Sequence, residues 1–386
     1  MKICVAFLLF TQFFSSVFAQ ERKEIPALIQ QLQDQNKQVR IAAIKEIKRL
    51  GVDAKAAIPA LALLLKDGED DLRENAAEAL GKMGAEARTA TPALTDALKD
   101  RDALVRSNAA YALGQIGVEA RAATPALGDL LKDQNAWARG NAAFALGKVG
   151  EAKPYLPSLI DLLKDQNENV RRDSAEAIGR IGADAKMAVP PLIVLLKDKS
   201  APVRRYTAEA LGRIGPEAKP AIPELVASLQ DKEFVVRTHS AYALSKIGVE
   251  AKAAIPVWTA LLKDSSEHLR SYAADSLGDI GPDARDAAPA LIVALKDQDR
   301  FVRVSASKGL GKIGADARTS VPALIETLKD KEPLVRASAA TALGKMGALA
   351  RPALPALTEL QKDQADVVKL AADGAVAKIR SSEIKP

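Results

Sequence analysis

The chain has 386 residues, of which 48% are hydrophobic, only 4% are aromatic and 27% are charged, with a formal net charge of +6. This composition excludes a disordered chain. The single cysteine, Cys4, lies within the first twenty residues, so a chain that loses this segment has no disulfide, cysteine-zinc site or cysteine nucleophile. A core rich in alanine and leucine but poor in aromatics favours stacked helices over ordinary globular domains.

The first nineteen residues have the pattern of an export signal. Lys2 gives a positive start, an apolar stretch runs over Ile3–Phe10 and continues towards Val17, and Val17–Ala19 matches a signal-peptidase site before Gln20. The alternative is an uncleaved anchor, but polar residues interrupt a segment already shorter than the usual span of about 20 residues. We therefore expect residues 1–19 to be a signal peptide. The remaining chain is then exported, periplasmic or extracellular, with no transmembrane segment after cleavage.

From residue 20 to 386 the chain is one repeated unit. A proline recurs every 33 residues, with a single 32-residue step from Pro125 to Pro157, and an aspartate and a basic residue keep the same phase. A fixed period of this length indicates a stack of structural repeats. Charged residues such as Glu46 and Asp373 replace alanines in the first and last units, which is typical of polar capping repeats. The eleven units start near residues 25, 58, 91, 124, 156, 189, 222, 255, 288, 321 and 354.

Each unit predicts two helices, here called helix A and helix B. In one unit, Pro92 suits the first position of helix A, with Thr91 as its N-cap, because proline lacks the N–H group that is unpaired there. After a polar turn, Asp102 caps helix B, which ends at Gly117. A helical hairpin cannot bury its apolar face alone, so the units must stack around one continuous core. The sequence therefore predicts an all-α, right-handed solenoid of about eleven two-helix repeats.

The repeat also resembles a known family. The string Asp-x5-Arg-x2-Ala-Ala-x-Ala-Leu-Gly-x-Ile-Gly runs from Asp100 to Gly117 and recurs, with Met in place of Ile, from Asp330 to Gly347. It is similar to the short HEAT repeat of the phycobilisome-lyase type, and the similarity extends from residue 25 to about 380. The resemblance implies an armadillo-type α-solenoid. It says less about activity, because similar repeats serve as scaffolds, as chromophore lyases and, in deoxyhypusine hydroxylase, as an iron-dependent oxygenase.

The repeat arginine is expected to form a structural ion pair. At 100° per residue it falls inside the arc of the alanine, leucine and isoleucine positions of helix B, so its side chain should be largely buried. A buried guanidinium needs a carboxylate, and the in-phase aspartate is the only acid present in every unit. The alternative is a basic strip that contacts phosphates. We predict an aspartate–arginine ladder along the stack that includes Asp100, Arg106, Asp133, Arg139, Asp198, Arg204, Asp231 and Arg237.

The residues two, five and nine positions after the repeat arginine form an exposed line on helix B, here called the helix B stripe, which resembles the concave wall of similar solenoids. The ninth position is basic in nine of eleven units, and five aromatic residues lie at the second and fifth positions. Aromatics beside basic residues are typical anchors of a protein or peptide site, although the rings can instead lie flat on neighbouring side chains. The predicted binding residues are Tyr111, Phe144, Tyr206, His239, Tyr242, Tyr272, Arg180, Arg213 and Lys246.

No catalytic constellation is visible in the sequence. The two histidines, His239 and His268, occupy different positions of adjacent units, and neither is followed by glutamate as in the iron-binding repeats of deoxyhypusine hydroxylase. We therefore predict a non-enzymatic scaffold, without cofactor or metal, that binds a protein or peptide partner outside the cytoplasm. One alternative is a metal-dependent oxidoreductase or lyase of the kind that the resemblance implies. Another is a binder of anionic polymers, lipid head groups or nucleic acid, but nucleic acid is not expected because each unit offsets its bases with acids.

Overall fold

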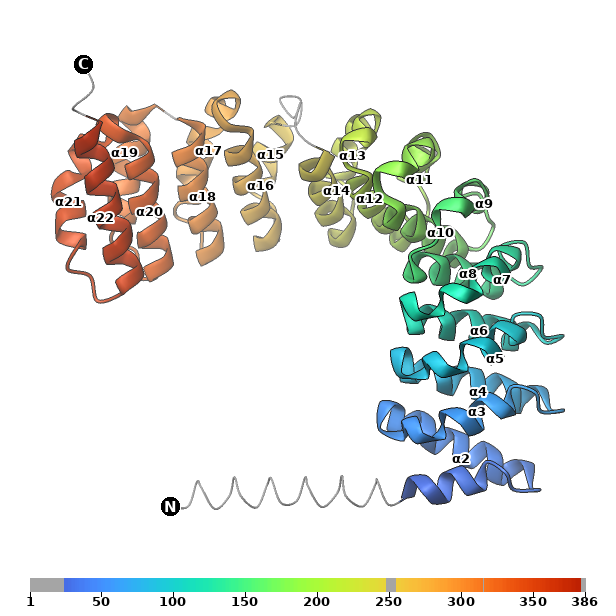
Figure 1. Cartoon of the computed structure of the whole chain (residues 1–386). Coiled ribbons are helices and arrows are strands. Elements are labelled where there is room, and N and C mark those ends of the chain that lie inside the picture. The colour runs from blue at the N-terminus through green and yellow to red at the C-terminus, as the bar shows by residue number, and fades with distance from the viewer. Residues whose placement is uncertain (1–23, 248–254, 315, 383–386) are drawn as a thin grey trace, which may run out of the picture. The chain divides into compact units, whose positions relative to one another are not determined.

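The computed structural model describes residues 24–247, 255–314 and 316–382, so the expected signal peptide, residues 1–19, lies outside the described part of the chain. The described residues are mostly helical and contain no strand. They divide into two compact units, with the boundary between Ile214 and Gly215. Within each unit, each helix B packs against helix A of its own repeat and against helix B of the next repeat (Figure 1). The prediction of an all-α solenoid is confirmed.

The first unit contains six repeats. Helix A recurs as residues 24–31, α3 (Ile58–Leu64), α5 (Thr91–Ala97), α7 (Thr124–Leu130), α9 (Leu156–Leu162) and α11 (Val189–Leu195). Helix B recurs as α2 (Lys37–Leu50), α4 (Asp70–Met83), α6 (Ala103–Ile116), α8 (Ala136–Val149), α10 (Glu168–Ile181) and α12 (Ala201–Ile214).

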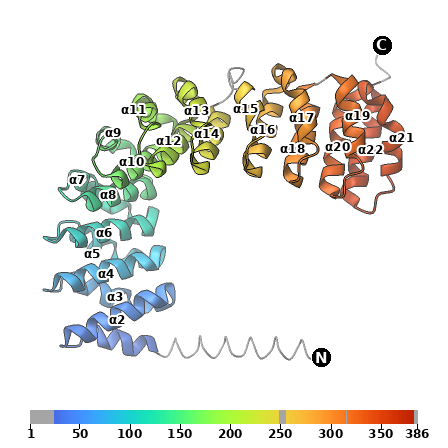
Figure 2. The same cartoon turned by 180° about the vertical axis from the view of Figure 1, so that it is seen from behind.

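The second unit contains the remaining five repeats, and Figure 2 shows its B helices side by side in chain order. Helix A recurs as α13 (Ile222–Ser228), α15 (Ile255–Leu261), α17 (Ala288–Ala294), α19 (Ala317–Thr327) and α21 (Leu354–Leu360). Helix B recurs as α14 (Phe234–Ile247), α16 (Glu267–Ile280), α18 (Arg300–Ile313), α20 (Pro333–Lys345) and α22 (Asp366–Ser381).

Short 3-10 helices, which the repeat pattern did not predict, link one repeat to the next. In η2 (Gly84–Ala90) the residues Ala87 and Ala90 are buried, and the chain passes directly from η2 into α5. The expected N-cap role of Thr91 is wrong, because Ala90 already has helical dihedral angles and the Thr91 side chain makes no capping hydrogen bond. The other linkers are η1 (Gly51–Ala57), η3 (Gly117–Ala123), η4 (Lys153–Tyr155), η5 (Gly182–Ala188), η6 (Gly215–Ala221), η8 (Gly281–Ala287) and η9 (Gly347–Ala353).

The ends of helix B follow from local sequence chemistry. In α6, Asp102 Oδ1 accepts hydrogen bonds from the backbone N–H groups of Leu104 and Val105 at 2.8 and 3.1 Å, so the predicted N-cap is confirmed. The helix ends at Gly117, which has φ 75° and ψ −139°. Residues with a side chain avoid this positive φ, and the repeat therefore places glycine there.

The repeat arginine and aspartate hold consecutive repeats together. Arg106 donates from Nε and Nη2 to both carboxylate oxygens of Asp133 at 2.7 and 2.9 Å, and from Nη1 to the Asp100 carbonyl of its own repeat at 2.8 Å. Asp133 Oδ1 also accepts the backbone N–H of Asn135 at 2.8 Å. Each rung therefore joins helix B of one repeat to the turn that precedes helix B of the next repeat.

The same offset pairing recurs in both units. The Asp100 carboxylate accepts from Arg73 at 2.6 and 2.8 Å, whereas Arg106 bonds only the Asp100 carbonyl. Arg204 Nη1 donates to the Asp198 carbonyl of its own repeat at 2.7 Å. Arg237 Nη1 donates to the Asp231 carbonyl at 3.0 Å, and its guanidinium lies 3.3 Å from Asp264. The other rungs are Arg139–Asp165, Arg171–Asp198, Arg270–Asp297, Arg303–Asp330 and Arg336–Asp363.

Because of the ladder, the folding stability should depend on pH in the acidic range. Burial alone would raise the pKa of Asp133, but the Arg106 guanidinium and the Asn135 N–H outweigh it and hold that pKa below its usual value. The pKa of Asp198 is lowered in the same way by Arg171 and the Ser200 N–H. A carboxyl group whose pKa is lower in the folded state stabilises the fold above its unfolded pKa, and this contribution is lost as the pH falls through the folded pKa.

We therefore predict that stability is nearly constant from about pH 8 to pH 5 and falls steeply below about pH 4, where unfolded aspartates take up protons. The measurement is the urea midpoint as a function of pH. Asp198→Asn keeps the shape of the side chain but removes its titration. Its loss of stability at low pH should therefore be shallower than that of the wild type. Glu359→Gln is the control, because Glu359 and its partner Lys362 are exposed. Parallel curves for the wild type and Asp198→Asn would contradict a role of the ladder.

Candidate functional site

In the first unit, two predicted aromatics of the helix B stripe lie together. The rings of Tyr111 and Phe144 are stacked, with centroids 5.7 Å apart and an interplanar angle of 17°. Lys148 Nζ lies 5.4 Å from the Phe144 centroid. Both rings are half-buried, and each lies over a glycine of the preceding helix B: a Cβ atom on Gly81 would lie 3.3 Å from Tyr111, and one on Gly114 would lie 2.7 Å from Phe144. These rings therefore contribute to repeat packing as well as to the surface.

Two arginines of the stripe in this unit are paired with glutamates of their own helices. Arg180 donates to Glu176 at 2.8 Å and Arg213 donates to Glu209 at 2.7 Å, each along its own helix. Tyr206 is half-buried, and the Arg205 guanidinium lies 4.7 Å from its ring centroid. These glutamates lie four residues before the arginines, as expected for a self-paired helix surface.

In the second unit, the predicted residues are held by local contacts. His239 Nδ1 lies 2.7 Å from the Val235 carbonyl of its own helix. Lys246 Nζ lies 5.5 Å from the Tyr242 centroid. The Tyr272 hydroxyl lies 2.7 Å from Ser245 Oγ, which itself donates to the Tyr242 carbonyl at 2.7 Å. Each unit therefore has its own aromatic cluster on helix B.

Burial gives Tyr272 a structural role. Its ring lies 6.1 Å from the ring of Trp258, which is only 2% exposed and belongs to the core. Burial raises the pKa of the Tyr272 phenol, and the hydrogen bond with Ser245 opposes this effect only in part. Among the predicted stripe residues, Tyr272 is therefore tied to the packing of α15 and α16.

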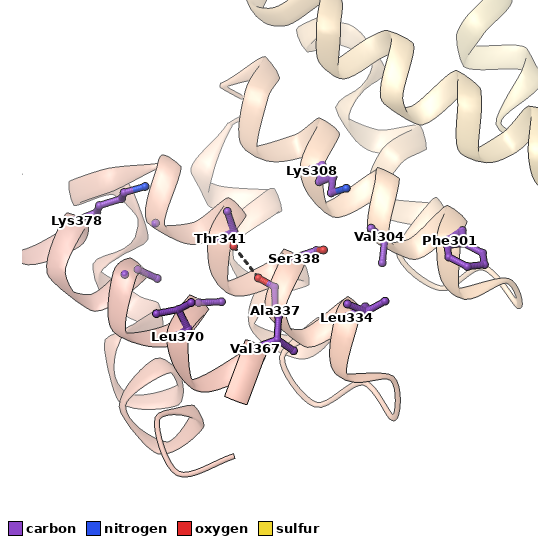
Figure 3. A pocket seen from close by; sticks show the side chains of 14 residues that line it. Phe301, Val304, Lys308, Leu334, Ala337, Ser338, Thr341, Val367, Leu370 and Lys378 are labelled. Atoms are coloured by element: carbon purple, nitrogen blue, oxygen red, sulfur yellow. Dashed lines mark hydrogen bonds between the residues drawn. The ribbon is translucent and has the colours of Figure 1, made fainter. Parts of the chain in front are cut away.

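A groove that the sequence analysis missed lies across the last three B helices. It has a volume of about 640 Å³ and crosses α18, α20 and α22 (Figure 3). Its wall is formed by Phe301, Leu334, Val367 and Leu370, which are 52%, 51%, 47% and 75% exposed. Exposed apolar side chains that gather in one concave surface are typical of binding sites.

These residues were missed because they lie outside the helix B stripe. Phe301, Leu334 and Val367 stand two positions before the repeat position of the arginine, whereas Leu370 stands one position after it. Both positions are apolar in each of the last three repeats, whereas the second repeat has Asp71 in the first of them. The apolar character of both positions in the last three repeats is the sequence signal that could have revealed the groove. The last repeat also departs from the predicted polar cap, because Leu370 is the most exposed large hydrophobic residue of the described chain.

The groove is basic as well as apolar. Lys308 and Lys378 line it, and Lys345 lies on the same line of helix B. Within residues 24–247, 255–314 and 316–382, no carboxylate lies within ion-pair distance of these three lysines, whereas Lys312 pairs with Asp279 at 2.6 Å. Thr341 also lines the groove, and its hydroxyl donates to the Ala337 carbonyl of its own helix at 2.8 Å. The free lysines therefore leave the groove with an uncompensated positive charge.

The described part of the chain contains no group of three or more His, Cys, Asp or Glu side chains placed to hold a metal ion. No helix within the described ranges is both long enough and apolar enough to span a membrane.

Helical hairpins that stack through one core define an α-solenoid. The sequence matches the HEAT repeats family over residues 25–114, 85–136, 124–193, 189–257, 255–319 and 315–377. The chain therefore belongs to the HEAT-repeat family, as predicted. Its finer similarity to the phycobilisome-lyase type stays a prediction.

Solved structures show the same fold at low sequence identity. A crystal structure of an engineered protein is 21% identical, with a TM-score of 0.61, and the match covers 92% of this chain and 99% of that one. A crystal structure of importin beta is 16% identical, with a TM-score of 0.55, and the match covers 92% of this chain but only 56% of importin beta. No curated protein sequence matches the chain.

Proposed function

We propose that the protein is a scaffold that binds a protein or peptide partner through the surfaces of its B helices. The observation that carries this proposal is the groove of α18, α20 and α22, where four apolar side chains stay exposed beside lysines that have no carboxylate partner among the described residues. A hydrophobic centre with a charged rim is the usual anatomy of a protein interface. Stacked helical repeats are suited to present such extended surfaces.

The aromatic clusters of the helix B stripe are a second part of this proposed surface. Tyr206 and Tyr242 are half-buried, and each has a cation near its ring. Tyrosines that expose one edge and carry a neighbouring base are favoured as interface anchors. Binding rather than catalysis is the proposed activity, and the concave side of the solenoid is its proposed location.

The proposed place of action is outside the cytoplasm. The support is the sequence pattern of residues 1–19, with a positive start, an apolar stretch and a cleavage site at Ala19. A partner is therefore to be sought in the envelope or the medium of the native organism.

Photo-crosslinking in the native envelope tests this proposal. A photoreactive amino acid is placed at Phe301, Leu334 or Tyr242 on helix B, and at Val293 on helix A as a control that is 69% exposed. We expect one discrete adduct with the same partner from the helix B positions and none from Val293. In the same material, N-terminal sequencing should show a chain that begins at Gln20. Adducts at Val293 alone, or at no position, would contradict a helix B binding surface.

A further inference from the structure

We propose that the groove of α18, α20 and α22 binds an acidic amphipathic helix. This inference rests on the proposed function and adds the kind of partner that the last three repeats accept. Phe301, Leu334, Val367 and Leu370 would contact the apolar face of that helix, and Lys308 and Lys378 would pair with its carboxylates.

The surface itself favours a helical partner. Every wall of the groove is a side-chain surface of an α-helix, and helices offer no extended row of free backbone N–H and C=O groups such as the edge of a sheet has. A partner seated there finds no free backbone edge, so it must satisfy its own backbone hydrogen bonds. An α-helix does this, and an amphipathic helix in an apolar groove is a recurrent mode of recognition.

The dimensions agree with a short helix. The groove crosses three consecutive B helices, and packed helices are spaced by about 8–10 Å, so its length is about 20 Å. At 1.5 Å per residue, a helix of this length has about 13 residues. Its apolar side chains would recur every three or four residues on one face, so that side chains about six or seven residues apart meet the successive rows of Phe301, Leu334 and Leu370.

The charge selects the class of partner. The groove is lined by two lysines and by no acidic residue, and Lys345 adds a third positive charge on α20. These ammonium groups have no carboxylate partner among the described residues, whereas Lys312 on α18 pairs with Asp279 and Arg180 in the first unit pairs with Glu176. Unpaired lysines around an apolar surface steer and select negatively charged partners.

The segments of this chain outside the described residues do not have the required charge. Residues 1–23 contain three basic residues, Lys2, Arg22 and Lys23, against the single acid Glu21, residues 248–254 contain one acid and one base, and residues 383–386 are Glu-Ile-Lys-Pro. We therefore infer that the acidic helix belongs to another molecule. A second copy of the chain and an anionic lipid surface are the competing occupants that the experiment must distinguish.

The test uses the whole exported chain and designed peptides. A fluorescent 14-residue helical peptide with leucines on one face and glutamates on its flanks is compared with the same peptide that carries lysines in place of the glutamates. Fluorescence anisotropy at several salt concentrations gives the affinities. We expect the acidic peptide to bind at least tenfold more tightly at low salt, with a preference that weakens as salt rises.

Two variants place the peptide in the groove. Leu370→Asp adds a negative charge at a position that is 75% exposed and should weaken the acidic peptide at least tenfold, whereas Val293→Asp, a matched change at an exposed residue of α17, should have no effect. Lys308→Glu with Lys378→Glu should reverse the preference, so that the lysine peptide binds better. A reversal of preference cannot arise from loss of folding.

Each contrary result overturns the inference in a different way. Equal binding of both peptides, or no change in Leu370→Asp, would exclude an acidic helix as occupant. Sedimentation that shows a dimer broken by Leu370→Asp would assign the groove to a second copy. Co-sedimentation with vesicles of anionic lipid but no peptide selectivity would assign it to a membrane surface. If the peptides fail while the helix B crosslinks persist, the scaffold function stands and only this partner class is wrong.

Discussion

Replacing Asp198 with alanine is expected to destabilise the repeats on both sides of it by about 3–5 kcal/mol. Asp198 and its partner Arg171 form a deeply buried rung, with side chains 9% and 8% exposed, and the variant leaves the Arg171 guanidinium without its carboxylate. It also removes the acceptor of the Ser200 N–H, which Asp198 Oδ1 binds at 2.8 Å. Uncompensated buried charge is among the most costly changes that one substitution makes.

Hydrogen exchange measured by mass spectrometry checks this prediction repeat by repeat. Repeat proteins are stabilised by neighbour interfaces, so protection should be lost mainly in α10, α11 and α12. The variant Asp198→Asn should lose less protection from exchange, because the asparagine keeps an acceptor for both Arg171 and Ser200. Glu359→Ala on the exposed pair with Lys362 should change exchange little. Unchanged protection in Asp198→Ala would show that the ladder does not hold the repeats together.

Replacing Gly311 with valine is expected to destabilise the second unit by about 2–3 kcal/mol. A Cβ atom at Gly311 in α18 would lie only 2.9 Å from the Cα atom and 3.0 Å from the Cβ atom of Ala342 in α20. The neighbour is backbone, so the two helices must move apart to admit any side chain. The close packing of consecutive B helices depends on this small residue.

Gly374 provides the matched control for this substitution. It lies within α22, and a Cβ atom there would meet nothing within 4 Å. Valine has a slightly better helix propensity than glycine, so Gly374→Val should change the free energy of unfolding by less than about 0.5 kcal/mol. If both variants lose the same stability, the loss is a property of valine in the helix and not of the contact with Ala342.

The ladder shows how far sequence reasoning reaches. The phase of the aspartates and arginines, and the place of the arginine inside the apolar arc of helix B, predict a buried ion pair from one chain alone. They do not say which aspartate an arginine binds, because Arg106 has Asp100 six residues before it and Asp133 twenty-seven residues after it. In the structure, the Arg106 guanidinium forms its ion pair with the Asp133 carboxylate. Its only bond to Asp100 is the one from Nη1 to the backbone carbonyl.

The candidate binding surface, too, could be predicted from the sequence only in part. The concentration of aromatics on helix B is visible in the sequence, but the packing of Phe144 over Gly114 and the bond between Tyr272 and Ser245 depend on neighbouring repeats. The exposed groove of the last three repeats was not predicted, because a leucine on a helix does not reveal whether another helix covers it. Leu370 is exposed, whereas Ala337 at the same repeat position is 7% exposed.

The sequence by itself therefore determined the repeat, the two helices of each unit, the cap at Asp102, the end at Gly117 and the all-α solenoid, since each follows from local chemistry and from a fixed period. Only the tertiary structure decided the 3-10 linkers, the offset of the ladder by one repeat, and the surface on which Leu334 and Leu370 stay uncovered. The physical reason is that exposure and pairing across repeats depend on how close the next helix approaches, and that distance is a property of the packed stack rather than of any one repeat.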